Sequence, residues 1–346
     1  MRRWIIGIML FCIIALPASA MEFTAPVAPE AAQPYMPDSE ETFAQGLWHI
    51  IKTAITATQP ELSGTAGLCL SAVVLVLLLS VLKNISKDSQ FPIRPTGAVV
   101  LGLLLLEPMG TMIRLGSDTV CQLSDYCKLI LPVMTSALAA QGGTTTSAAL
   151  YTGTALFNAL LSGVISRVVV PALYIYLCFC VASSALDQEL LKKIRDFVKW
   201  FMTWLLKWTL YIFTGYISVT GVVSGAVDAS VLKATKISIS GAVPVVGGIL
   251  SDATETILVS AGLLKNTAGV YGIFAVLSIC IGPFIKIGIP YLLLKFTAGI
   301  TDTLDYKPAA SLIHDFATGM GLVLAMTGTV CVLLLVSLAC FLKGLG

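Results

Sequence analysis

The chain has 346 residues, of which 57% are hydrophobic and 12% are charged, and its mean hydropathy is +0.91. Soluble domains carry about 45–50% apolar and about 25% charged residues, so a soluble enzyme is excluded as the default class, as are disordered and collagen-like chains. The 21 Lys and Arg against 19 Asp and Glu leave a net charge of +2, too small to indicate nucleic-acid binding. The composition predicts a membrane protein that crosses the bilayer several times.

The N-terminus has the features of a cleavable signal peptide, residues 1–20. Two arginines follow Met1, an apolar run extends from Trp4 to Leu16, and the segment ends on Ala18-Ser19-Ala20. The apolar run is too short to cross a hydrocarbon core of about 30 Å, which needs about 20 residues. We expect cleavage after Ala20, with an uncleaved first helix as the alternative.

Residues 21–65 are expected to form an acidic segment outside the cytoplasm. They contain six acidic residues and a single base, Lys52. Asp38 and Glu41 have the spacing of a capping box, and apolar residues recur at helical spacing from Phe43 to Ile55. The pattern predicts one amphipathic helix, which lies on the membrane or on the protein's own outer face, or docks a partner.

Apolar runs then follow over residues 66–342, the expected multi-span membrane domain. We predict an all-α polytopic fold with seven to nine transmembrane helices, since the regions 129–165 and 268–300 allow more than one count. The runs lie near 66–82, 97–113, 129–146, 148–165, 168–185, 203–223, 268–282, 287–300 and 318–342.

Basic residues in short loops predict the cytoplasmic side. Lys83, Lys87 and Arg94 lie between the first two runs, and a second basic cluster, residues 192–199, lies between the fifth and sixth. With nine spans and the N-terminus outside, both clusters and the C-terminal tail, residues 343–346, are cytoplasmic. If the region 268–300 contains one span more or fewer, the C-terminus lies on the opposite side of the membrane.

Residues 224–266 are too polar and too interrupted to cross the bilayer as one helix. Gly and Pro break the backbone hydrogen-bond ladder, so we expect an outside amphipathic element or a re-entrant hairpin. Asp252 and Glu255 have capping-box spacing, and a Gly-x-x-x-Gly pair before the segment favours close helix packing. The candidate packing or assembly residues are Gly221, Gly225, Pro244, Gly247, Gly248, Asp252, Glu255 and Lys265.

Glu107 is the candidate intramembrane charge. It follows four leucines and precedes Pro108, and an ionisable side chain within a span is a functional hypothesis by default. It either pairs with Arg114 or faces a water-filled interior or pore. Arg167, Lys286 and Lys295 are expected near span ends, where their side chains reach the interface.

Catalytic chemistry is not indicated. The two histidines are His49 and His314, and His314 stands beside Asp315, but neighbours on a helix do not face one another. We expect no catalytic, cofactor-binding or metal-ligating residues. Cys121 and Cys127 are predicted in a polar connection, where they bridge if it faces an oxidising side. Trp200, Trp204 and Trp208 share one helix face, typical of an interface anchor.

The region 211–300 resembles the stage III sporulation protein AE family. The resemblance is carried by Gly221-Val-Val-Ser-Gly-Ala-Val-Asp228, Lys233-Ala-Thr-Lys236, Val243-Pro244-Val-Val-Gly247-Gly248, Ser251-Asp252-Ala-Thr-Glu255 and Leu264-Lys265-Asn266. It implies a non-enzymatic, multi-pass subunit of the channel complex between mother cell and forespore, placed in the mother-cell membrane and needed for late forespore gene expression.

The same resemblance implies the partners. They are other stage III sporulation A membrane and ring proteins, an associated ATPase and, indirectly, stage II sporulation protein Q on the forespore side. Two other classes remain open from the residues. One is a stand-alone secondary transporter with its site in 224–266, and the other is an intramembrane enzyme based on His314 and Asp315.

Overall fold

The computed structural model describes residues 26–37, 42–85, 93–140, 144–219, 267–304 and 306–344. This part of the chain is built from helices alone, which confirms the predicted all-α class. The elements are η1 (Gln33–Tyr35), α2 (Phe43–Ile85), α3 (Ile93–Ala140), α4 (Thr144–Val164), η2 (Ile165–Val169), α5 (Val170–Leu186), α6 (Glu189–Val219), α9 (Thr267–Asp302) and α10 (Lys307–Gly344).

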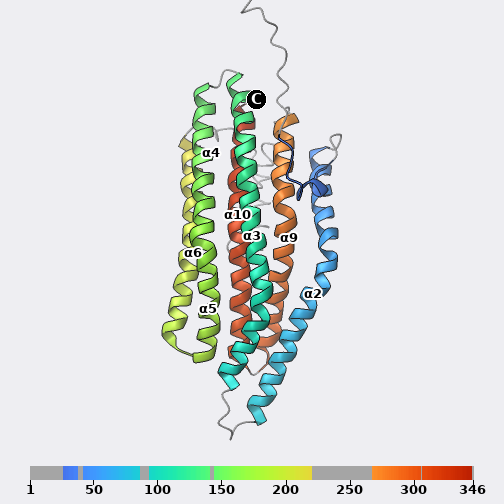
Figure 1. The fold of residues 1–346 in the computed structure, drawn as a ribbon, viewed down its shortest axis with the longest axis vertical. Helices are drawn as coiled ribbons and strands as arrows, with labels where there is room; N and C mark the ends of the chain where they lie inside the picture. Colours follow the sequence, from blue (N-terminus) through green and yellow to red (C-terminus); the bar gives the residue numbers. More distant parts are fainter. Residues whose placement is uncertain are drawn as a thin grey trace, which may run out of the picture.

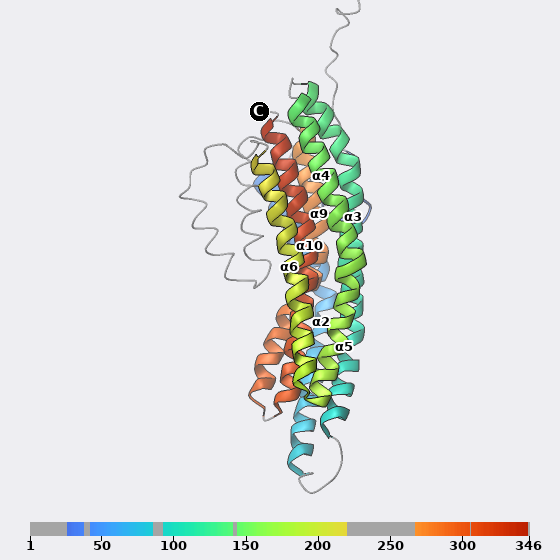
Figure 2. The same ribbon diagram turned by 90° about the vertical axis from the view of Figure 1, so that its left-hand side faces the viewer.

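The long helices run up and down in one elongated bundle, with α10 at its centre (Figures 1 and 2). In the most apolar stretch of 18 residues in α10, 94% is buried inside the bundle. A helix that is apolar on all sides belongs in a core, and α10 accordingly packs against α3, α4, α5, α6 and α9. α2 lies on the outside, mainly against α9.

The two ends of the bundle are formed by different parts of the chain. One end is called the basic end. It contains the last residues of α2, the first residues of α3 and the turns that join α5 to α6 and α9 to α10 (Figure 1). At the far end, Phe43 stacks on Phe274 with ring centroids 5.2 Å apart, and a Cβ at Gly269 would meet Leu342. The C-terminus therefore lies at the far end, away from Arg94, which corrects the nine-span prediction.

Several predicted spans merge into single helices. The runs 97–113 and 129–146 share α3, the runs 148–165 and 168–185 share the continuous α4–η2–α5 helix, and 268–282 and 287–300 share α9. Five helices in the described residues are long and apolar enough to cross a membrane, so a count of seven to nine is not confirmed. The amphipathic α6 carries most of the run 203–223.

The merged helices exceed the thickness of a bilayer. α3 has 48 residues, and at 1.5 Å per residue a helix of that size is about 72 Å long. A hydrocarbon core is about 30 Å thick. The bundle is therefore about twice as long as a lipid core requires.

The charged residues between the two apolar runs of α3 lie on one face of the helix. Asp118 and Asp125 are exposed, whereas Leu123 and Tyr126 are buried. Polar side chains on one face leave the other free to pack, so the helix continues where a connection was predicted.

Cys121 and Cys127 lie inside α3 rather than in a connection, and the disulfide that the sequence left open is not formed: both thiols are free, one exposed and one buried. Six residues along a helix separate Cα atoms by about 9 Å, beyond the roughly 7 Å limit of a disulfide.

The start of α2 is capped by the side chain of Gln45. The Thr42 hydroxyl and backbone N–H both donate to Gln45 Oε1, at 2.7 and 3.1 Å, and the helix begins at Phe43. Asp38 and Glu41, where a capping box was predicted, both lie outside the described residues. The predicted amphipathic helix and the first span are one continuous helix, with Pro60 inside it.

Gly116 tests the contact between α3 and α10. A Cβ there would lie 2.6 Å from Val323 Cγ1 and 2.8 Å from Met326 Cε, whereas one at Gly110 would meet nothing within 4 Å. We expect Gly116→Val to lower the free energy of unfolding by about 1–3 kcal/mol through overpacking. Gly110→Val makes the same change of helix propensity on the same helix and should leave stability nearly unchanged. Unfolding in mixed micelles measures both, and equal losses would contradict the packing.

Candidate functional site

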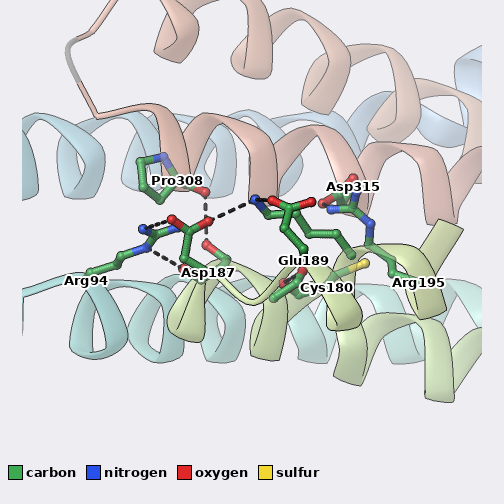
Figure 3. Close-up of polar contacts among 10 residues, drawn as sticks. Arg94, Cys180, Asp187, Glu189, Arg195, Pro308 and Asp315 are labelled. Atoms are coloured by element: carbon green, nitrogen blue, oxygen red, sulfur yellow. Dashed lines mark hydrogen bonds and ion pairs between the residues drawn. The ribbon is translucent and has the colours of Figure 1, made fainter.

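An ionic cluster, formed by Arg94, Asp187, Lys192, Arg195 and Asp315, joins three helices and a turn at the basic end (Figure 3). Arg94 Nη1 lies 2.6 Å from Asp187 Oδ2, and Lys192 Nζ lies 2.9 Å from Asp187 Oδ1. Both oxygens of this carboxylate are therefore paired. The two basic loops expected on one side of the membrane thus meet directly, which confirms that they share an end.

Asp187 also makes the turn between α5 and α6. Its φ of 52° is left-handed, and its N–H donates to Ser183 O at 3.1 Å to close α5. Asp is among the few residues with a side chain that adopt this conformation readily. The Arg94 guanidinium and the Lys192 ammonium hold the pKa of the Asp187 carboxyl well below its usual range. Its contribution to stability is therefore complete at neutral pH and is lost only as acid protonates it.

Arg195 and Asp315 form the most buried ion pair among the described residues. Their Nη1 and Oδ2 atoms are 2.5 Å apart, and the side chains are 15% and 13% exposed. The backbone around the pair is also bound: Tyr176 donates its hydroxyl to Asp315 O at 3.1 Å, and Ser184 donates to Pro308 O at 3.0 Å. The pair and these bonds fasten α5 and α6 to α10.

From the sequence, Asp315 is notable only as the neighbour of His314. In the structure His314 is exposed and Asp315 is buried, so the two side chains take different surroundings. Arg195 and Asp315 are 120 residues apart, so no local spacing in the sequence predicts their contact.

A pocket of about 460 Å³ opens beside the ionic cluster. Four basic side chains line it, those of Arg94, Lys192, Arg195 and Lys307, together with Asp187, Asp315 and three serines. In the part of the chain that the structure describes, no group of three or more His, Cys, Asp or Glu gathers to hold a metal ion. The pocket is therefore suited to an anion by its charge.

A second cavity, the central cavity, lies halfway along the bundle between α2, α3, α9 and α10. It measures about 530 Å³ and its walls are mostly apolar, with Lys286, Thr65 and Thr111 as polar lining residues. Lys286 was predicted at a span end, but α9 runs through it from Thr267 to Asp302. Lys286 is therefore central and half-buried, which corrects the prediction, while Lys295 lies two turns from the basic end.

Arg167 is likewise central rather than terminal. It lies in the π-helical turn η2, inside the continuous helix from Thr144 to Leu186, and its side chain is exposed.

Glu107 lies on the outer surface of α3 and is exposed. It does not face the interior of this subunit, and no ion pair joins it to Arg114 within the described residues. Thr111, one turn further along, lines the central cavity. Glu107 therefore stands at the outer edge of that cavity's α3 wall.

The exposed face of α6 carries the tryptophan stripe expected from the sequence. Trp200, Trp204 and Trp208 are exposed, and successive ring centroids are 6.2 and 6.0 Å apart. Phe197 precedes them on the same face with its ring 5.9 Å from that of Trp200. The stripe begins next to the ionic cluster and presents aromatic surface outward.

The other predicted site residues lie outside the described residues. These are Gly221, Gly225, Pro244, Gly247, Gly248, Asp252, Glu255 and Lys265, together with the signal peptide. The helices on either side of this segment, α6 and α9, finish and start at the far end (Figure 2).

The fold and these sites define an all-helical integral membrane protein with a charged end and an apolar bundle. The family described as Stage III sporulation protein AE matches residues 35–344. The chain therefore belongs to the stage III sporulation protein AE family.

A curated relative supports the assignment. Stage III sporulation protein AE of Bacillus subtilis (strain 168) is 25% identical over 241 residues, which cover 69% of this chain and 60% of the relative. The match thus spans less than two thirds of the relative's length. No solved structure matches.

The Arg195–Asp315 pair predicts an asymmetric response to substitution. Arg195→Met leaves Asp315 unpaired in a mostly buried position, so we expect a loss on the order of 3 kcal/mol in the free energy of unfolding. Arg195→Met combined with Asp315→Leu should recover most of it. Lys128→Met removes an ion pair whose side chains are 67% and 71% exposed, and should cost less than about 0.5 kcal/mol. A double variant no more stable than Arg195→Met would contradict the pairing.

Proposed function

We propose that this protein is a non-enzymatic membrane subunit of the channel complex that links mother cell and forespore, placed in the mother-cell membrane and needed for late forespore gene expression. The observation that carries the proposal is the family match over 35–344, because it covers the helical bundle almost end to end. The partners we propose are other stage III sporulation A membrane and ring proteins, an ATPase and, indirectly, stage II sporulation protein Q.

The bilayer in this proposal surrounds the half of the bundle next to the basic end. On α2, the candidate span Leu62–Lys83 has 22 residues, and it runs from the central cavity, where Gly64 and Thr65 lie, to the basic end. Its outward side chains are apolar, as lipid requires. They include Leu70, Val74, Leu77, Leu78, Val81 and Leu82.

A central basic belt, formed by Arg114, Arg167 and Lys286, marks the other boundary. Lys286 lines the same cavity as Met112 and Leu115, which places it level with Arg114. Arg167 lies between Asn158, bonded to Ser124 of α3, and Val181, against Gly102 of α3, and so reaches the same height.

Long basic side chains favour the interface between lipid and water. Arg114 lies 20 residues after Arg94, about 30 Å along a helix, which equals the thickness of a lipid core. The ionic cluster and the central basic belt are thus spaced as two membrane boundaries, and the exposed Glu107 lies about 10 Å along α3 from the belt, on its lipid side. The far half of the bundle then projects beyond the lipid.

The basic end is cytoplasmic in this arrangement, because positive loops remain inside. The far half then faces the space between the two membranes, where forespore-side partners are reached. Its outward residues on α2 and α3 include the polar Lys52, Gln59, Asp118, Asp125 and Lys128, interspersed with exposed apolar side chains such as Trp48, Ile55 and Leu129. This polar surface is the part of the chain we assign to contact with the ring proteins.

The function is tested by deleting the gene in its spore-forming host and following starved cells. We expect forespores that are engulfed and then shrink, with late forespore transcription at least tenfold lower, restored by the wild-type gene. Reporter activity and forespore volume are the measurements. Normal spores, or a defect during vegetative growth, would reject the channel role and favour a stand-alone transporter.

The bilayer placement is tested with two native cysteines. Cys121, in the far half, and Cys178, in the half next to the basic end, are the exposed thiols among the described residues. With a membrane-impermeant maleimide on protoplasts, Cys121 should be labelled, whereas Cys178 should be protected by lipid.

The matched variants identify the labelled thiol. Cys121→Ser should lose the label and Cys178→Ser should keep it, while both label after detergent solubilisation. Loss of label in Cys178→Ser alone would place the bilayer around the other half. Labelling of Cys121 only in inside-out vesicles would reverse the orientation.

A further inference from the structure

We propose that the pocket beside the ionic cluster is a binding site for a phosphate group. Its four basic side chains come from α3, α6 and α10, and only two carboxylates line it with them. Four positive and two negative charges leave a formal charge of +2 within about 460 Å³. Such an excess on converging side chains favours an anion with several acceptor oxygens.

The two carboxylates are already engaged by specific partners. Asp187 is held by Arg94 and Lys192, and Asp315 is held by Arg195. Lys307 makes no ion pair among the described residues, and its side chain is exposed to the pocket mouth. Two further carboxylates, which do not line the pocket, also pair with its bases: Glu189 with Lys192 and Asp196 with Arg195. The unpaired positive charge therefore resides at Lys307. Arg94 uses its Nε and Nη1 atoms for Ser184 and Asp187, which leaves part of its five-donor guanidinium for a ligand.

Hydroxyl donors complete the site. Ser311, one turn after Lys307 on α10, lines the pocket and is exposed. Both residues lie in the first turns of a 38-residue helix, where the helix dipole is positive. A planar guanidinium, an ammonium and a hydroxyl are together the donors that phosphate oxygens accept.

The place of the pocket indicates two sources for the phosphate group. Phe197 and Trp200 are exposed on α6 at the same end of the bundle, and exposed aromatic rings at this position are typical of the lipid–water boundary. An anionic lipid headgroup reaches the pocket from the membrane, and inorganic phosphate reaches it from water. Both present the same chemistry to Lys307.

The test uses the full chain in micelles of a neutral detergent, with thermal unfolding and thermophoresis as readouts. Dioctanoyl phosphatidylglycerol and inorganic phosphate are the probes, and dioctanoylglycerol and sodium chloride of equal ionic strength are their controls. We expect at least one phosphate-bearing probe to bind and neither control to do so. Binding of the lipid alone assigns the site to a headgroup, and binding of both with mutual competition assigns it to the phosphate group itself.

Lys307→Gln should weaken binding about tenfold, the loss of one charge-assisted contact, with no change in the unfolding temperature without probe. The matched control is Lys193→Gln, an exposed lysine at the same end that does not line the pocket; it should bind like the wild type. Equal weakening in both variants, or no binding by either probe, would overturn the proposal. The test is independent of sporulation, so its failure leaves the proposed function standing.

Discussion

The burial of α10 on all sides is the constraint on which the rest of the bundle depends. Its candidate span is mostly apolar around the whole circumference, and 94% of its most apolar 18-residue stretch is buried. At least three other helices must therefore cover it. Glycines allow the approach: a Cβ at Gly319 would lie 2.9 Å from Met109 Cε, and one at Gly321 would lie 3.2 Å from Tyr291 Cε2. The surrounding helices take their lengths and positions from this contact.

The ionic cluster then fixes how these helices align along their axes. An apolar interface between two helices tolerates slippage, but a buried charge does not, because it needs its partner. If α6 slipped by one turn along α10, Asp315 would be buried without a partner, and Arg195 would keep only its neighbour Asp196. Asp187 adds a second constraint, since Arg94 of α3 and Lys192 of α6 must reach the same carboxylate. Charge therefore sets the register and apolar surface supplies the contact.

The sequence predicted the helical class, the shared end of the two basic loops and the tryptophan stripe, because these depend on composition and local spacing. It failed on the number of spans. Hydropathy dips around Asp118, Arg167 and Lys286 predict breaks, but the helices continue, because Asp118 and Arg167 face outward and Lys286 lines the central cavity. The pairing of Arg195 with Asp315 could not be predicted from the sequence either, because a contact between residues 120 positions apart leaves no local pattern.

The continuity of α3 gives the molecule a mechanical property. A helix of 48 residues with no loop connects the ionic cluster directly to the far end, and its internal prolines, Pro108 and Pro132, are the places where it bends most easily. For a rod of about 72 Å, a tilt of about 5° at one end moves the other by about 6 Å. A tilt of α3 at the basic end would therefore be enlarged into a displacement at the opposite end.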